Sequence, residues 1–404
     1  MSAPDPTSPD PKSFDPTSSG GVSHSRGLGS VVLAGGGTGG HIEPALALAQ
    51  CLRRHDPGIR VTCLGTPKGL ESQLIPRRGW DLRLVPAYPL PRRPGVDLLR
   101  TPGRIATSVR AVREVLDDVA ADVVVGFGGY VAVPAYLAAW RSRTPMVVHE
   151  VNNPAGIANR LGARLTSYIA LGGAHVGLRR GEVVGVPLRP EISGLNRQQD
   201  RAQARRQFGL DPDRPTLLVF GGSQGARSLN NAVAAAVPEF SAAGVQVLHV
   251  IGARNNPEQL PGRALKDQAP KGQGAPYVTL NYIEAMDVAY NAADLALCRS
   301  GALTCAELAA VGLPAVYVPL PWGNGEQRRN ALPVVDAGGG LLTDDAVLSP
   351  QWLIEHVIPL LVDSVALARM SGAAANHGRR DGDEALRAMV YRAFTSKERT
   401  PHAR

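Results

Sequence analysis

The fold is decided by Val31-Val32-Leu33-Ala34-Gly35-Gly36-Gly37-Thr38-Gly39-Gly40-His41 and by its counterpart in the second half of the chain, Leu217-Leu218-Val219-Phe220-Gly221-Gly222-Ser223-Gln224-Gly225-Ala226. Each stretch has four apolar residues, a Gly-Gly pair and a small polar residue shortly after it. A buried strand that enters a glycine turn and then a helix forms an anion site, because bare N–H groups and the positive end of the helix dipole face the ligand. Two such units predict two similar α/β domains that face a shared cleft.

The chain of 404 residues is long enough for two domains of ordinary size. Its formal net charge of +8 favours an anionic partner, such as a phosphorylated substrate or an acidic membrane surface. We expect no nucleic-acid partner, because zinc-finger spacing, an aromatic RNA-binding strand and a long lysine run are absent. The four cysteines lack CxxC spacing and are typical of a reducing compartment. No signal peptide or membrane span is expected, since glycines and Pro134 interrupt the uncharged stretch Val123–Trp140.

Strand and helix patterns alternate along two segments, which predicts parallel sheets covered by helices on both faces. We place an N-terminal Rossmann-like domain at 28–188 and a C-terminal one at 189–374, and the last helix, about 375–395, can pack back on the first domain. Residues 1–27 are predicted to be a disordered tail, and the composition is again that of a tail over 396–404. The predicted strands are 30–34, 60–64, 82–85, 123–125, 145–149, 167–170, 216–220, 246–251, 278–280, 295–297 and 315–318.

The first glycine turn contains the string GxGxxG, formed by Gly35, Gly37 and Gly40, so a dinucleotide site must be considered. Such a site also needs an acidic residue at the end of the second strand to bind the ribose hydroxyls. That strand ends Cys63-Leu64-Gly65-Thr66-Pro67, with no acid, which disfavours a nicotinamide-dependent oxidoreductase. His41, at the start of the following helix, is either a general base facing the cleft or a helix-capping histidine.

Polar side chains follow two other strands of the first domain, at the edge where open α/β sheets bind ligands. The first group, His149-Glu150-Val151-Asn152-Asn153, is an unusual concentration of hydrogen-bonding groups after an apolar strand, although a surface loop is the alternative. The second, Gly126-Phe127-Gly128-Gly129-Tyr130, is either a functional glycine turn or close packing of a loop.

The second domain carries a comparable motif in Arg299-Ser300-Gly301-Ala302-Leu303-Thr304-Cys305-Ala306-Glu307. Its small residues let a diphosphate approach a helix N-terminus, and Thr304 adds a hydroxyl. Glu307 lies one turn further on, where it either accepts both hydroxyls of a ribose or forms a capping box with Thr304. Glu326 and Gln327, in the loop after the last predicted strand, can bond sugar hydroxyls or remain solvated.

A basic stretch runs from Tyr88 to Arg113, with Asp97 as its single acid and apolar residues interleaved. This pattern favours an anionic membrane surface over a solvated helix face. Its arginines are Arg92, Arg93, Arg100, Arg104, Arg110 and Arg113.

No metal site is expected. The two Asp-x-Asp strings, Asp211-Pro212-Asp213 and Asp381-Gly382-Asp383, do not lie at the C-terminal end of a strand and are interpreted as surface turns.

Taken together, these motifs resemble the MurG family, the N-acetylglucosaminyltransferases that complete lipid II, the membrane-bound precursor of bacterial peptidoglycan. The resemblance covers about residues 30–390 and implies the GT-B architecture, with two Rossmann-like domains and the active site between them. It also implies inverting transfer of GlcNAc from UDP-GlcNAc to the C4 hydroxyl of the muramoyl unit of undecaprenyl-linked lipid I, without metal or cofactor, by a peripheral protein on the cytoplasmic side of the cell membrane. The resembling segments are 36–41, 128–130, 149–150, 221–227, 299–304 and Asn330-Ala331-Leu332-Pro333.

The resemblance also implies roles for individual residues. The donor would be held by Arg189, Ser223, Ala302, Leu303, Thr304, Glu307 and Gln327, with the backbone of Ile283 at the uracil edge and Tyr282 over the uracil ring. From the N-terminal domain, the sugar and the acceptor pyrophosphate would meet Thr38, Gly39, Gly40 and Asn152. Positions associated with the acceptor or with catalysis are His41, Tyr130, Glu150 and Asn230. His41 is the first candidate for the base and Glu150 the second, an order that the sequence does not establish.

The chain departs from the family pattern in three places, which affect the sugar contacts and leave the class unchanged. They are Glu326 in place of the first of two glutamines, Val151 and Asn153 in the His-Glu motif, and Val186 in the Asn-Pro-x-Arg hinge. Besides the oxidoreductase, the alternatives are a GT-B transferase with another lipid or natural-product acceptor, a UDP-GlcNAc epimerase and a non-enzymatic membrane-bound scaffold.

Overall fold

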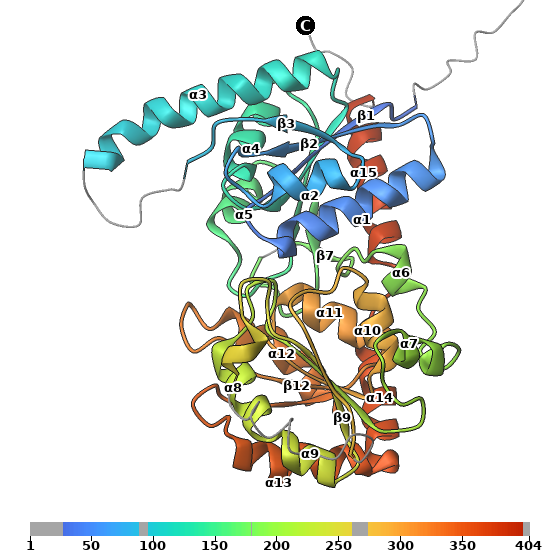
Figure 1. Cartoon of the computed structure of the whole chain (residues 1–404). Helices are drawn as coiled ribbons and strands as arrows, with labels where there is room; N and C mark the ends of the chain where they lie inside the picture. The colour runs from blue at the N-terminus through green and yellow to red at the C-terminus, as the bar shows by residue number, and fades with distance from the viewer. Residues whose placement is uncertain (1–26, 89–95, 179, 261–273, 399–404) are drawn as a thin grey trace, which may run out of the picture.

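The structure is a computed structural model that describes residues 27–88, 96–178, 180–260 and 274–398. These residues form two α/β domains, each built on one parallel sheet, which lie one above the other in Figure 1. The strand order is β3-β2-β1-β4-β5-β6-β7 in the first sheet and β10-β9-β8-β11-β12-β13 in the second. The predicted class, α/β with two Rossmann-like domains, is therefore confirmed.

The first sheet consists of β1 (Ser30–Gly35), β2 (Arg60–Gly65), β3 (Asp81–Leu84), β4 (Val123–Gly128), β5 (Met146–Glu150), β6 (Ile169–Leu171) and β7 (Glu182–Val183). Its helices are α1 (Gly39–His55), α2 (Glu71–Arg77), α3 (Val96–Asp118), α4 (Ala132–Arg141) and α5 (Ile157–Gly162). The long helix α3 packs against α4 and projects from the domain (Figure 1).

The second sheet consists of β8 (Thr216–Phe220), β9 (Gln246–Val250), β10 (Tyr277–Leu280), β11 (Leu295–Cys298), β12 (Ala315–Tyr317) and β13 (Gly340–Leu342). Its helices are α6 (Pro190–Ser193), α7 (Arg201–Gln207), α8 (Arg227–Ala235), α9 (Val237–Ala242), α10 (Met286–Ala292), α11 (Ala302–Val311), α12 (Glu326–Asp336), α13 (Pro350–Val362) and α14 (Ser364–His377). A 3-10 turn spans Pro257–Gln259.

Both central strands are buried on both faces, which explains their unbroken apolar sequences. In β1, Val31 and Leu33 face one core cluster, and Val32 faces another on the opposite side of the sheet. In β8, Leu217 and Leu218 divide between the two faces in the same way. Because successive side chains of a strand alternate between faces, each domain has two cores with the sheet between them.

The order of each sheet reverses at its central strand, since β1 lies between β2 and β4, and β8 lies between β9 and β11. Open α/β sheets bind ligands outside the carboxyl ends of the strands at such a reversal. The turn after β1 and the turn after β8, the two glycine-rich stretches, therefore occupy equivalent positions in the two domains.

The last helix, α15 (Gly382–Glu398), follows the C-terminal domain in sequence and packs against α1, β4 and β5 of the first domain. Figure 1 shows it in red beside α1. Leu386, Met389, Val390 and Phe394 are buried in the core on that face of the first sheet. The first domain therefore uses residues from both ends of the chain.

Several element bounds differ from those predicted. The short strand β13 was not predicted. The apolar spacing of residues 105–116 predicts only the later part of α3, which begins at Val96 and runs through Pro102 and Gly103. The predicted tails lie almost wholly outside the described residues. Within those residues, no single helix combines the length and the hydropathy needed to cross a bilayer. The segments Pro350–Val362 and Ser364–Ser396 meet both criteria when they are taken together, but they are bent by 89° at the break between them.

Candidate active site

The glycine turn after β1 fixes the ring of His41. Its Nδ1 atom lies 3.0 Å from the carbonyl oxygen of Gly36 and 3.3 Å from Thr38 Oγ1. Because a carbonyl oxygen only accepts hydrogen bonds, this contact places a proton on Nδ1, so that the neutral ring has its lone pair on Nε2. The Nε2 atom lies beside Gly128, where a Cβ atom would come within 3.1 Å of it. His41 is half-buried, and its Nε2 lone pair is free to accept a proton in this tautomer.

Glu150, the other candidate base, is buried and surrounded by donors. Its carboxylate accepts the backbone N–H groups of Val151, Asn152 and Gly156 at 2.7–2.9 Å and the side-chain amide of Asn159 at 3.1 Å. A carboxylate offers about four acceptor positions, so these bonds leave it little capacity to take a proton from a substrate. The geometry gives Glu150 the task of shaping the loop after β5, and it favours His41 as the base.

A carboxylate that the sequence reasoning missed lies beneath the first glycine turn. Glu71, the first residue of α2, accepts the N–H of Gly37 at 2.8 Å, and the N–H and hydroxyl of Thr66 at 3.0 and 2.9 Å. Burial opposes its charge, yet these hydrogen bonds outweigh the desolvation and lower the pKa of Glu71. An acid is thus present near the end of β2, but it is 1% exposed and bonded to the loop, so it cannot reach a ribose.

The glycine turn after β8 is braced by the segment that follows β9. Asn255 donates to the carbonyl of Gln224 at 3.0 Å and to that of Ile251 at 2.7 Å, and Ala253 N–H donates to the carbonyl of Ser223 at 3.0 Å. Ser223 itself is exposed at the carboxyl edge of the sheet. Among the residues that the structure describes, no carboxylate accepts a hydrogen bond from this loop, in contrast to Glu71 at the first turn.

The start of α11 lies after the neighbouring strand β11. Its N-cap is Gly301, and Glu307 accepts a hydrogen bond from Tyr290 Oη at 2.8 Å. The capping-box alternative for Thr304 and Glu307 is therefore wrong, because Thr304 lies inside the first turn of the helix. Glu307 is buried, and the desolvation raises its pKa to about 7 even though Tyr290 and Arg189 favour the charged form.

Residues of both domains meet at the junction, where α1 contacts α11 (Figure 1). Arg189 Nε lies 3.6 Å from Glu43 Oε2 of α1, and both atoms are buried without a hydrogen bond. Arg329 of α12 donates to the carbonyl of Asn153 in the first domain at 3.4 Å. The carboxyl edges of the two sheets thus supply groups to the same junction.

Comparison with known proteins assigns the family. A model of the glycosyltransferase family 28 N-terminal domain matches residues 31–170, and a model of the family 28 C-terminal domain matches residues 216–386. A UDP-N-acetylglucosamine--N-acetylmuramyl-(pentapeptide) pyrophosphoryl-undecaprenol N-acetylglucosamine transferase of Streptomyces coelicolor is 53% identical over 91% of this chain and 99% of its own. The same enzyme of Mycolicibacterium smegmatis is 57% identical over 87% of this chain and 91% of its own. The crystal structure of Acinetobacter baumannii MurG matches with a TM-score of 0.71 and 27% identity, covering 90% of this chain and 99% of that one.

The chain belongs to the MurG family. The resemblance read from its ordered motifs is thereby confirmed, and so is the GT-B fold.

The structure distributes the residues that the MurG resemblance singled out over three places. Those at the carboxyl edge of the second sheet are Ser223, Ala302, Leu303, Thr304, Glu307 and Gln327. The side-chain oxygen of Gln327 accepts a hydrogen bond from the N–H of Leu320 at 3.1 Å. Those at the edge of the first sheet are Thr38, Gly39, Gly40, His41, Tyr130, Glu150 and Asn152. Arg189 lies at the junction, and Ile283 is buried next to the exposed Tyr282.

Asn230 is the exception among these residues, because it lies inside the second domain. Its side chain donates to the carbonyl of Ile251 at 2.9 Å, and its oxygen lies 3.1 Å from His249 Nε2. Both ends of the amide are therefore used within the domain, next to the brace of the second glycine turn. Its assignment to the acceptor side stays a prediction from the resemblance.

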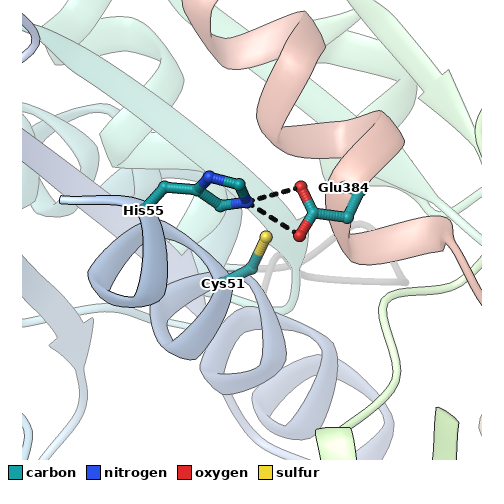
Figure 2. A group of neighbouring side chains, drawn as sticks. All are labelled: Cys51, His55 and Glu384. Carbon is teal, nitrogen blue, oxygen red and sulfur yellow. Dashed lines mark hydrogen bonds and ion pairs between the residues drawn. The ribbon is translucent and has the colours of Figure 1, made fainter. Parts of the chain in front are cut away.

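Metal-ligating side chains gather away from these edges, where α1 meets α15. Within the described residues, Cys51, His55 and Glu384 form the one group whose ligand atoms lie close enough to hold an ion (Figure 2). Burial raises the pKa of the Cys51 thiol to about 12, and Glu384 already accepts hydrogen bonds from His55, Arg54 and Arg387. Guanidinium groups around the carboxylate oppose a cation, so this group acts as an ion-pair contact between the two helices.

Proposed function

We infer that this chain transfers GlcNAc from UDP-GlcNAc to the C4 hydroxyl of the MurNAc unit of undecaprenyl-pyrophosphoryl-MurNAc-pentapeptide (lipid I), with inversion, and so forms lipid II. The observation that carries this conclusion is identity of 52–57% with enzymes named for this transfer, over most of the chain. The two glycine turns supply the chemistry that such a transfer needs at opposite sides of the junction.

In the proposed mechanism, His41 Nε2 takes the proton of the acceptor C4 hydroxyl while the hydroxyl oxygen attacks the anomeric carbon of GlcNAc. The bond between that carbon and the β-phosphate oxygen breaks, and UDP leaves with the electron pair. The leaving diphosphate faces the loop of Ser223 and the N-terminus of α11, whose N–H groups and helix dipole favour the developing negative charge. Glu307 accepts the ribose hydroxyls.

The test supplies UDP-GlcNAc with a lipid I analogue and measures UDP release and the disaccharide product. Release that requires the acceptor supports the transferase, whereas release without it and without product supports the epimerase alternative. His41→Ala should lower kcat by about 100-fold or more, the usual contribution of a general base. Near wild-type turnover of His41→Ala would overturn the assignment of the base. Full activity in the presence of a chelator is expected of the metal-free mechanism.

We also propose that the protein binds the cytoplasmic face of the cell membrane peripherally, through the basic stretch and helix α3. The support is that Arg110 and Arg113 are exposed on α3, and that exposed aromatic side chains, Tyr88 and Trp140, lie on the same domain. Arg92 and Arg93 lie outside the described residues. An arginine near an anionic surface contributes about 1 kcal/mol, and aromatic rings favour the interfacial region.

Vesicle flotation tests this surface. Arg110→Glu should weaken binding to phosphatidylglycerol vesicles by about tenfold at low salt, and less at high salt, because the attraction is screened. Arg369→Glu is the matched control, since Arg369 is exposed on α14 of the other domain. Equal loss in the two variants would contradict the proposed surface.

A further inference from the structure

Glu71 is an enclosed carboxylate in contact with the acceptor-side glycine turn. A Cβ atom on Gly36 would come within 2.8 Å of Glu71 Oε1, and one on Gly65 within 2.5 Å of its Cγ atom. No salt bridge to Glu71 occurs among the residues that the structure describes, so N–H and O–H groups alone compensate its charge. A buried carboxylate held in this way is expensive to keep unless its hydrogen bonds serve the fold or the site.

One peptide group connects Glu71 to His41. The carbonyl of Gly36 and the N–H of Gly37 belong to the same planar amide. The carbonyl oxygen accepts from His41 Nδ1 at 3.0 Å, and the N–H donates to Glu71 Oε2 at 2.8 Å. The carboxylate and the imidazole are therefore linked through a single polarisable unit.

An anion that accepts a hydrogen bond from the N–H of an amide increases the negative charge on the carbonyl oxygen of the same amide, because hydrogen bonds in a chain polarise one another. The Gly36 oxygen then holds the Nδ1 proton of His41 more strongly. This fixes the tautomer whose Nε2 atom is free, and it stabilises the imidazolium that forms when Nε2 takes a proton. The carboxylate of a Ser-His-Asp triad does the same by direct contact.

We propose that Glu71 is a positioning residue of the transfer reaction, which orients His41 and supports its basicity through the Gly36–Gly37 peptide. The proposal rests on the proposed role of His41 as the base. It places a negative charge beneath the first glycine turn, on the side of the Gly36–Gly37 peptide opposite His41.

The other charged groups around His41 lack this connection. His41 Nε2 and the side-chain amide of Asn159 both lie near Gly128, and that amide is bonded to Glu150 and to the carbonyl of His149. On α1 itself, Glu43 is paired with Arg78 at 3.3 Å and faces Arg189. Within the described residues, Glu71 is thus the carboxylate with a hydrogen-bonded route to Nδ1.

The pH dependence of kcat/KM tests the proposal. Glu71→Gln keeps the size of the side chain and an oxygen for Gly37 N–H. It removes the charge and places an amide donor beside Thr66, whose hydroxyl oxygen can accept it. We expect about a tenfold loss of kcat/KM at pH 7 and a shift of the ascending limb to lower pH, since a less stabilised imidazolium loses its proton more readily. Thr66→Val is the control, because it removes only the hydroxyl donor to the other carboxylate oxygen and keeps the backbone N–H donor. The ascending limb of its pH profile should stay in place.

If Glu71→Gln lowers kcat/KM equally at all pH values and the ascending limb does not move, Glu71 has only a structural role. Unchanged kinetics in Glu71→Gln would overturn the proposal outright. If Glu71→Gln fails to fold, nitrogen NMR of the wild-type histidines decides, because the neutral ring of His41 must carry its proton on Nδ1. A proton on Nε2 would contradict the proposal. Turnover retained by His41→Ala would instead refute the base assignment, independently of any result with Glu71.

Discussion

At the scale of single residues, three buried glutamates near strand ends have different chemistry because their neighbours differ. Glu150 and Glu71 both accept hydrogen bonds from backbone N–H groups, and at Glu71 these bonds outweigh burial and lower the pKa. Glu307 has a single hydrogen bond from Tyr290 and is otherwise desolvated, so its pKa rises to about 7. Residue type alone therefore does not assign a role at these sites, and the number of donors around each carboxylate does.

The raised pKa of Glu307 predicts that donor binding weakens in mild acid. Only the ionised carboxylate accepts both ribose hydroxyls, and at pH 6 about a tenth of it is ionised. The KM for UDP-GlcNAc should rise by about tenfold between pH 8 and pH 6, with KM for the acceptor as the internal control. A flat donor KM over this range would contradict the assignment. Because the folded pKa exceeds the ordinary 4.5, this group also lowers stability as pH rises from about 4.5 through 7.

Glu150→Gln should destabilise the first domain rather than alter the pH profile. The new amide would place a donor against the N–H of Gly156 or against those of Val151 and Asn152, which leaves buried donors unpaired. We expect a loss of about 2 kcal/mol in the free energy of unfolding, measured by urea denaturation. Glu239→Gln, on an exposed position of α9, should change it little. If Glu150→Gln is stable but its ascending pH limb disappears, Glu150 is the base.

At the scale of elements, each glycine turn depends on the loop of a neighbouring strand. The turn after β1 contacts α2 through Glu71, and the turn after β8 contacts the segment after β9 through Gly225. A Cβ atom on Gly225 would collide with the carbonyl of Ile251, and its φ of 76° lies in the left-handed region. The precise path of the donor loop is therefore set by backbone that is distant in sequence.

Gly225→Ala should consequently cost more than Gly222→Ala in the same turn. Both residues have positive φ, but a Cβ atom on Gly222 would meet nothing within 4 Å, so only the backbone strain of about 1 kcal/mol applies there. Gly225→Ala adds a backbone collision and should raise the KM for UDP-GlcNAc strongly or prevent folding. Thermal unfolding and donor KM measured on both variants give the comparison. Equal effects would contradict the bracing of this turn.

The sequence predicted most elements and the family, because apolar strands followed by glycine turns are local patterns. It could not predict the bonds of Glu71, since nothing in residues 65–71 records that the side chain folds back under residues 36 and 37. Nor could it decide between His41 and Glu150, whose difference lies in how many N–H groups converge on each. It left a capping box of Thr304 and Glu307 open beside the ribose role, because Ser/Thr-x-x-Glu spacing also occurs one turn inside a helix.

At the scale of the whole molecule, α15 makes the first domain depend on the end of the chain. Leu386 is fully buried against the first sheet, and Arg54 of α1 pairs with Asp383 at 2.9 Å. Leu386→Ala should lower the stability of the first domain by about 3 kcal/mol, as expected for a leucine removed from a core. The control is Val365→Ala, which alters a side chain that is 76% exposed on α14.

Hydrogen exchange measured during denaturation reports on the two domains separately in the Leu386→Ala and Val365→Ala variants. Amides of β1 and β4 should lose protection in Leu386→Ala, while those of β8 and β11 keep it. Uniform loss across both sheets would show that the domains unfold as one unit, and it would contradict a local role for α15.

The return of α15 also has a consequence for synthesis on the ribosome. Every strand and helix of the second domain lies between residues 190 and 377 in the described structure, so that domain can complete its fold while the last residues are still being added. The first domain is translated earlier, yet the part of its sheet near β4 and β5 that α15 covers stays exposed until residues 386–394 emerge. The nascent chain should therefore mature in the reverse of its order of translation, and the junction that brings donor and acceptor together should form only at the end.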